Sequence, residues 1–562
     1  MINFIPPGLV LIIAGFLLPL VPKQLFRIIA FLAPIITIFI VLQIPDGVLI
    51  QRTFLDYSIE IVEGDRLSRL FALIFSIMAL GGTIFAINNI KTTKELGFAF
   101  IYAGSAIGVT FSGDLISMFV FWEIMAIGST MVIWNGLELT SHKAGLRYAL
   151  VHFFGGVILM IGIIGNINQT GSTNFDIVTL NSWAQWLMLI GILINAGAWP
   201  ISSWIGDAYP EASASGMVFL SAFTTKTAVF VLIKTFPGTD ILIYIGLIMI
   251  FYGIIYALLE NDMRRILAYS IVNQVGFMVT GIGIGTEMAI NGAAAHAFAH
   301  IIYKALLLMS AGSVLYMTGK RKCTDLGGLY RTMPITTICG IIGALAISSF
   351  PLTSGFISKS MISQSAADLH LTYVWFLLTA ASAGVFLHAG IKFPWFVFFQ
   401  KDSGLRPKDP PFNMKISMIL FAGLCIIIGI FPSILYSLLP FKVDYVPYTS
   451  GHVTAYLQLL LFAGLAFFIL LPQMKRTLTI SLDTDWIYRI AGYKIIQFLS
   501  KELKLLIDGI KGGTPEQINS FIEYIVKYHG PAGILARTLP TGRTIFWVII
   551  IFALFLLLTL LS

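Results

Sequence analysis

The chain has 562 residues, of which 57% are hydrophobic and only 11% are charged. Soluble domains average about 25% charged residues, so this composition excludes a water-soluble globular protein. Apolar runs longer than about 18 residues recur from one end of the chain to the other, and runs of that length predict transmembrane helices. We therefore expect an all-α polytopic membrane protein.

The net charge of +8 does not indicate a nucleic-acid partner, because the lysines and arginines lie between the apolar segments. The three cysteines, Cys323, Cys339 and Cys425, are far apart and show no metal or redox spacing. No basic region precedes the first apolar run and no small-residue cleavage pattern follows it, so we expect a permanent anchor rather than a signal peptide.

Apolar windows of about 20 residues predict roughly sixteen membrane spans. They lie near 5–22, 26–44, 67–88, 96–112, 115–135, 146–166, 184–203, 212–236, 240–259, 265–285, 289–317, 333–350, 371–399, 413–437, 454–472 and 544–561.

The loop cations indicate the orientation, because cytoplasmic loops carry an excess of lysine and arginine. Alternate loops hold clusters made of Lys23, Arg27, Lys91, Lys94, Lys143, Arg147, Arg264, Arg265, Lys320, Arg321, Lys322, Arg331, Lys401, Arg406, Lys408, Lys415, Lys475 and Arg476. The intervening loops hold scattered cations such as Arg52, Arg66, Arg69, Lys234, Lys359 and Lys442. Loop 204–211 is an exception, with Asp207 and Glu211 but no cation. Both termini are predicted on the outer side.

Two proline-containing stretches, 199–211 and 349–355, predict broken helices. Proline removes a backbone donor, and inside a membrane the freed backbone groups must face protein or a water-filled cavity. Pro394 is a third candidate break. Breaks at comparable places in two halves of a transporter indicate binding or conduction sites.

Residues 484–511 combine an apolar helical stripe with basic residues, which is typical of an amphipathic helix on the inner membrane surface. The alternative is a solvated helical extension. A second amphipathic stretch near 516–528 leads into the final span.

Three ionisable residues share one face of a predicted span. His296, His300 and Lys304 stand four residues apart, so on a helix they form a ladder with a rise of about 6 Å per step. A charged residue inside a membrane costs roughly 2.5–3.5 kcal/mol on insertion scales. Such a ladder therefore requires water, partners or a function.

Further ionisable residues lie in other spans. Glu123 and Lys226 fall well inside theirs, and Lys392 lies near the end of an apolar run with His388 four residues before it. Each is either part of a proton path or a static ion pair, and Lys392 and His388 have the further alternative of snorkelling to the surface.

Asp262, Arg264 and Arg265 lie at a helix entrance. We interpret them mainly as a cap and an inner-surface anchor, with proton entry as the alternative. One acid with several lysines and histidines in successive helices is the inventory of a hydrated proton path. The sequence has no nucleotide-binding loop, haem pair, iron–sulfur spacing or zinc signature, so we expect no cofactor.

Several motifs resemble one family, the proton-translocating antiporter-like subunits shared by Mrp-type Na+/H+ antiporters, respiratory complex I and related hydrogenases. They are FVFWEIMAIGS, GAWPISSWIGDAYPEAS, FTTKTAVFVLIK, DMRRILAYSIVNQVGFM and HAFAHIIYKALLLMSAGSV, in that order. The resemblance covers roughly residues 50–430, and the later LDTDWIYR resembles Mrp D subunits in particular.

The resemblance implies two inverted helix repeats, each with a broken helix, joined by a central polar axis. The implied division is 1–95 for N-terminal helices, 96–236 and 237–437 for two proton-conducting repeats, and 438–562 for C-terminal helices. Glu123 matches the acid of the first half-channel, and Lys226 matches the lysine that follows. The ladder matches the central connection, and Lys392 the terminal lysine or acid on the second broken helix.

The chain departs from this family pattern at the first break. The family lysine five residues before the proline is Asn195 here, while the lysine thirty-one positions later is retained as Lys226. The family histidine before the tryptophan is also absent, since Ser202 and Ser203 precede Trp204. Three alternatives follow: Lys226 partners Glu123, the first half-channel conducts differently, or it does not conduct. The extended C-terminus is a second departure.

The resemblance implies a proton-conducting subunit of a multisubunit monovalent cation/proton antiporter, with Na+ as the expected cation. Its partners would be other membrane subunits in the bacterial plasma membrane. The first alternative is a proton-pumping membrane subunit of NADH:quinone oxidoreductase (complex I) or of a membrane-bound hydrogenase. The second is a non-conducting scaffold.

Overall fold

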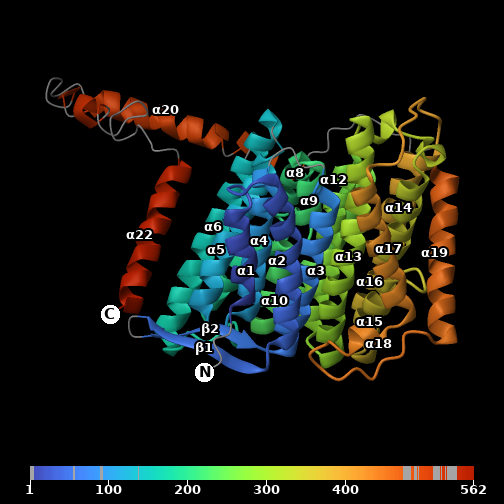
Figure 1. Cartoon of the computed structure of the whole chain (residues 1–562), viewed down its shortest axis with the longest axis horizontal. Coiled ribbons are helices and arrows are strands. Elements are labelled where there is room, and N and C mark those ends of the chain that lie inside the picture. The colour runs from blue at the N-terminus through green and yellow to red at the C-terminus, as the bar shows by residue number, and fades with distance from the viewer. Residues whose placement is uncertain are drawn as a thin grey trace. The chain divides into compact units, whose positions relative to one another are not determined.

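The structure, a computed structural model, describes residues 5–54, 57–88, 93–136, 138–472, 483–486, 490–491, 493–510, 519–520, 522–525, 527 and 541–561. The chain forms two compact units, Met1–Thr484 and Asp485–Ser562. The helices of the first unit stand side by side in Figure 1.

The bounds of the first unit's helices follow in chain order. They are α1 (Pro7–Leu17), α2 (Lys23–Gln43), α3 (Arg66–Ala86), α4 (Thr93–Phe111), α5 (Leu115–Trp134), α6 (Leu139–Thr170), α7 (Trp183–Ala196), α8 (Ser203–Ala208), α9 (Ala214–Leu220), α10 (Thr224–Thr235), α11 (Ile241–Leu259), α12 (Met263–Ile284), α13 (Glu287–Thr318), α14 (Pro334–Ile347), α15 (Ser354–Asp368), α16 (Thr372–Val385), α17 (Phe412–Ile430), α18 (Ser433–Tyr436) and α19 (Ser450–Leu470).

The prediction of an all-α multi-pass membrane protein is confirmed, with one small addition. Among the described residues, eleven helices are long and apolar enough to cross a membrane, and four shorter apolar helices accompany them. Every predicted window falls on a helix, although several are shorter than a full span. The addition is an antiparallel hairpin of β1 (Gly47–Phe54) and β2 (Tyr57–Gly64), where Gly47 pairs with Gly64.

Helix α13 lies in the interior of the first unit. It packs against α12, α14, α15, α17 and α9, and its residues from Ala289 to Val314 are buried. A helix that is buried on every side must satisfy its polar side chains within the protein. The ladder of histidines and lysine is on this helix.

Both predicted helix breaks are confirmed. Helix α7 ends at Ala196, where Gly197 takes a left-handed conformation with φ of 76° before α8 begins. Helix α14 ends at Ile347, and α15 begins only at Ser354. A further interruption, which the sequence did not predict, separates α9 from α10.

Helix α15 was missed as a membrane element, and the prediction that Lys359 lies in a loop was wrong. The sequence of α15, SGFISKSMISQSAAD, is too rich in serine to register as an apolar window. Its residues are nevertheless buried against α13 and α17, so tertiary packing rather than hydropathy holds it in place.

The predicted break at Pro394 was also wrong. Helix α16 runs on into two π-helical segments, Phe386–Lys392 and Trp395–Phe399, and Pro394 keeps helical angles. In an α-helix a proline ring clashes with a carbonyl of the preceding turn, and the wider π turn relieves this clash.

The second unit contains α20 (Tyr493–Ile510) and α22 (Thr541–Leu561). Ile495, Phe498 and Leu503 of α20 are exposed, which fits the predicted amphipathic helix. Its place on a membrane surface stays a prediction. Most of the predicted stretch 516–528 lies outside the described residues.

Candidate functional site

Glu123 lies in the middle of α5, with its carboxylate against Gly156 of α6. A Cβ atom at Gly156 would collide with Oε1 of Glu123, so a larger residue there would displace the carboxylate. Within the described part of the chain, no ion pair reaches Glu123, and its buried Oε1 has no hydrogen-bond partner. Glu123 is thus half-buried, and its buried Oε1 has unused hydrogen-bonding capacity.

Lys226 lies on α10 and is fully buried. Its Nζ donates to the carbonyl oxygen of Ser221 at 2.7 Å and to Oγ1 of Thr225 at 3.1 Å. Ser221 directly follows the end of α9. The lysine thus binds a carbonyl beside the interruption between α9 and α10, and no ion pair with Glu123 is formed among the described residues.

Asn195 lies at the end of α7 and has a partner that the sequence reasoning did not consider. Its Oδ1 lies 2.7 Å from Nδ1 of His152 on α6, and both side chains are buried. The His152 ring lies 4.0 Å from the Tyr148 ring and 4.5 Å from the Trp204 ring, centroid to centroid. The sequence indicates His152 as a candidate site residue, because it is a single histidine in the apolar run LVHFFGG. We name Glu123, His152, Asn195 and Lys226 the upstream site.

The predicted ladder on α13 is confirmed as a geometric feature. His296 and His300 stack with ring centroids 6.2 Å apart, close to the expected step. His296 contacts Ser358 of α15 through Nδ1 at 3.0 Å and Gln274 of α12 through Nε2 at 3.1 Å. Tyr303 donates to the same Gln274 oxygen at 3.0 Å.

His300 and Lys304 continue the ladder toward α12. Lys304 Nζ donates to Oγ of Ser270 at 2.9 Å, and both ring nitrogens of His300 lack a hydrogen-bond partner among the described residues. Both residues are fully buried. A neutral imidazole with an unused nitrogen can accept a proton and release one at the other nitrogen.

Lys359 extends this series from α15 and is fully buried. Its Nζ donates to the carbonyl oxygen of Ile347, the last residue of α14, at 2.7 Å, and lies 4.9 Å from the centre of the Phe277 ring. Ser358, next to it, holds His296. We name His296, His300, Lys304 and Lys359 the downstream site.

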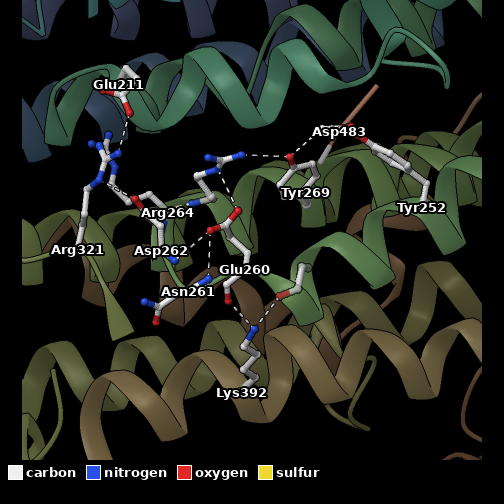
Figure 2. Close-up of polar contacts among 12 residues, drawn as sticks. Glu211, Tyr252, Glu260, Asn261, Asp262, Arg264, Tyr269, Arg321, Lys392 and Asp483 are labelled. Atoms are coloured by element: carbon white, nitrogen blue, oxygen red, sulfur yellow. Dashed lines mark hydrogen bonds and ion pairs between the residues drawn. The ribbon is translucent and has the colours of Figure 1, made fainter. Parts of the chain in front are cut away.

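The placement of Lys392 on the second broken helix was wrong, because that helix carries Lys359 instead. Lys392 ends a π-helical segment after α16. Its Nζ donates to the carbonyl oxygens of Ala257, Leu258 and Glu260 at 3.0, 2.5 and 2.6 Å. Figure 2 shows the side chain directed at this end of α11. His388 is also buried, with Nδ1 2.9 Å from the carbonyl oxygen of Gly384.

The polar cluster of Figure 2 joins the end of α11 to the start of α12. Asp262 accepts a hydrogen bond from the backbone nitrogen of Arg264 at 2.8 Å, which confirms the predicted cap. Its carboxylate also pairs with Arg321 at 2.6 Å, and Arg321 pairs with Glu211 at 2.8 Å. Glu260 pairs with Arg265 at 3.1 Å.

These pairs explain why loop 204–211 has carboxylates but no cation. Glu211 is neutralised by Arg321, and Asp207 by Arg147 at 2.7 Å. Burial raises the pKa of Glu211, but the hydrogen bond and charge of Arg321 outweigh it, so the pKa is lowered overall. Buried Arg264 holds the same region by donating to the carbonyl oxygens of Ala212 and Ser213 at 2.9 and 2.8 Å.

Asp483, in the motif LDTDWIYR, is buried against the same helices. Its carboxylate accepts hydrogen bonds from Tyr252 at 2.5 Å and Tyr269 at 2.6 Å, as Figure 2 shows. Among the described residues, no group of three histidines, cysteines or carboxylates could hold a metal ion.

Comparison with known protein families shows which family the central part of the chain matches. The family described as NADH:quinone oxidoreductase/Mrp antiporter, transmembrane region, matches residues 112–386, from the start of α5 to the end of α16. Residues 112–386 belong to this family. The resemblance inferred from the motifs is confirmed over this part of the chain.

Individual relatives agree with this placement. The A/B subunit of a probable K(+)/H(+) antiporter of Rhizobium meliloti is 29% identical over 65% of this chain, which spans only 39% of that relative's length. The D subunit of the Na(+)/H(+) antiporter of Alkalihalophilus pseudofirmus is 27% identical over 66% of this chain and 80% of its own. A chain in the structure of the membrane-bound sulfane sulfur reductase, an archaeal respiratory membrane complex, has the same fold. Its TM-score is 0.71 and its identity 24%, over 98% of this chain and 99% of that one.

Proposed function

We propose that this chain is the proton-conducting membrane subunit of a multisubunit monovalent cation/proton antiporter, with Na+ as the first cation to test. The observation that carries the proposal is the downstream site. Four proton-exchanging side chains from α13 and α15 are fully buried there without a carboxylate partner among the described residues.

Burying ionisable side chains without a counter-ion costs free energy, so packing alone does not explain the downstream site. A buried lysine that lacks a counter-ion is stabilised by losing its proton, and the same property makes it able to take the proton back. A ladder with a step of about 6 Å leaves room for single bridging waters between its members. The proposed path runs from Glu123 through Lys226 and the ladder to Lys359, with Lys392 at the end of α11.

The test is cation-driven proton exchange in everted membrane vesicles that contain the whole complex. We expect His300→Ala and Lys359→Ala to abolish exchange while the assembled complex is recovered in normal amounts. Lys442→Ala is the matched control, because Lys442 is exposed and pairs with Asp444 at the surface. Exchange at the wild-type rate in either ladder variant contradicts the proposal.

The second candidate is a proton-pumping subunit of a redox-driven complex. It is favoured by the shared fold with a chain of a respiratory membrane complex over 98% of the present chain. Purification of the native complex separates the two candidates. Partners with flavin or iron–sulfur groups, and proton movement only with an electron donor, support the redox pump. Small membrane partners and exchange without a donor support the antiporter.

A further inference from the structure

The upstream site contains a histidine placed between two groups that the path would need to join. His152 lies on α6 one helical turn before Gly156, and the Glu123 carboxylate lies against Gly156. One turn corresponds to a rise of about 6 Å. On its other side, Nδ1 of His152 lies 2.7 Å from Oδ1 of Asn195.

The hydrogen-bonding pattern defines the state of the imidazole. The amide oxygen of Asn195 accepts only, so Nδ1 of His152 carries a proton and Nε2 has a free lone pair. Nε2 of His152 and Oε1 of Glu123 are both buried and have no hydrogen-bond partner among the described residues. An acid from α5 thus lies against α6 one turn from a base on α6, and each has an atom available for proton transfer.

A chain of hydroxyl groups continues from His152 toward Lys226. The His152 ring lies tilted against the ring of Tyr148, whose hydroxyl lies 2.9 Å from Ser129 and 3.3 Å from Thr224. Thr224 also contacts Tyr102 at 2.6 Å and begins the helix that carries Lys226. These hydroxyl groups are all buried.

His152 also lies close to both places where the first break departs from the family pattern, Asn195 and the stretch before Trp204. It is hydrogen-bonded to Asn195 and contacts Trp204 edge to face, with ring centroids 4.5 Å apart. One side chain from α6 therefore contacts Asn195, where the first departure lies, and the tryptophan that directly follows the second.

We propose that His152 is the proton-carrying residue of the upstream site and that Asn195 is its positioning residue. The protonated Glu123 gives its proton to Nε2 of His152, which breaks the O–H bond and forms an imidazolium. Nε2 of the imidazolium then gives a proton to the Tyr148 hydroxyl oxygen, while the Tyr148 hydroxyl proton moves to Thr224. The Thr224 hydroxyl releases its own proton to the neutral amine of Lys226, so each hydroxyl gains one proton and loses one. This inference rests on the proposed function.

The experiment measures proton flux driven by an imposed pH difference in proteoliposomes that contain the whole complex. We expect His152→Gln to lower the flux at least about tenfold, because proton transfer by a positioned side chain contributes that much or more. Asn195→Ala should lower it about threefold, because it leaves the imidazole but removes its anchor. His142→Gln is the matched control, since His142 is exposed on the same helix.

A rescue separates proton transfer from packing. The double variant His152→Gln with Asn195→Lys removes the imidazole but places a proton carrier on α7, next to position 152. We expect its proton flux to lie within about threefold of the wild-type flux. A purely structural histidine would not be replaced in this way. Flux within twofold of wild type in His152→Gln overturns the inference. So does a double variant that assembles normally but conducts no better than His152→Gln. If His152→Gln assembles poorly, Asn195→Ala and the double variant carry the test.

Sodium uptake measured in the same proteoliposomes distinguishes this inference from the proposed function. Proton flux that depends on His152 without sodium uptake contradicts sodium antiport and supports the inference. Full exchange that His152→Gln leaves unchanged supports the antiporter and contradicts the inference. A wild-type complex that carries no proton flux contradicts both.

Discussion

The upstream and downstream sites both lie beside a broken helix, yet the two breaks are stabilised differently. At the end of α7, Ala198 donates to the carbonyl oxygen of Leu193 at 2.9 Å, and the Trp204 indole donates to that of Ile194 at 3.1 Å. At the end of α14, the carbonyl oxygen of Ile347 accepts from the ammonium of Lys359 at 2.7 Å. Backbone nitrogens cap both breaks, and the breaks differ in the side-chain donor, which is a neutral indole at α7 and a cation at α14.

The same rule places two further buried lysines. Lys226 binds a carbonyl where α9 ends, and Lys392 binds three where α11 ends. Helix ends leave unpaired carbonyls with partial negative charge, and these stabilise a cation inside a membrane. Since the end of α7 is already satisfied, an uncharged Asn195 is tolerated there. Freed carbonyls at helix ends thus hold Lys226, Lys359 and Lys392, whereas Lys304 is held by the Ser270 hydroxyl inside α12.

The largest effect should come from exchanging the cationic cap. Lys359→Met keeps the apolar stem but leaves the Ile347 carbonyl unpaired and removes a proton carrier. We expect proton flux in proteoliposomes to fall more than about tenfold. The corresponding change at the other break, Trp204→Phe, removes a donor but no proton carrier and should leave most of the flux. Equal losses in the two variants would contradict the distinction between the breaks.

A second prediction concerns the cap on α11. Lys392→Met leaves three carbonyl oxygens without their shared donor, and each unsatisfied buried group costs about 1–3 kcal/mol. We expect the free energy of unfolding to fall by about 3 kcal/mol, visible as a lower melting temperature of the purified complex. Lys442→Met, at an exposed ion pair, should change it little. An unchanged melting temperature for Lys392→Met would show that the carbonyls find other donors.

Trp204→Phe also gives a smaller prediction about stability. The variant keeps the aromatic ring against His152 but loses the hydrogen bond to Ile194. Loss of one buried hydrogen bond should lower the free energy of unfolding by about 1 kcal/mol. Thermal unfolding of the complex measures it, and a loss as large as that of Lys392→Met would mean that the two caps are equivalent.

The smallest effect should depend on pH. The pKa of Glu211 is lowered in the folded protein, so its pairing with Arg321 stabilises the fold above the unfolded pKa of about 4.3. That contribution is lost as the pH falls through the folded value. We expect Glu211→Gln to cost about 1 kcal/mol at about pH 7 and progressively less below about pH 4. Asp444→Asn, at an exposed pair, is the control, and a cost that does not vary with pH would contradict an electrostatic origin.

The limits of prediction from the sequence follow from particular residues. The spacing of His296, His300 and Lys304 predicted their shared face, because helical geometry depends only on nearby residues. Hydropathy misplaced Lys359 because the serines of α15 hide a helix that is buried by its neighbours. His152 was missed because its partner Asn195 lies on another helix, forty-three positions away.

By itself, the sequence determined the membrane class, the ladder, both helix breaks and the family resemblance of residues 112–386. These depend on composition, local spacing and short motifs, all of which are properties of neighbouring residues. Only the tertiary structure decided which cation meets which freed carbonyl, and which histidine lies beside Asn195. Those contacts join elements far apart in the chain, and a broken helix reveals its unpaired carbonyls only when a side chain from elsewhere reaches them.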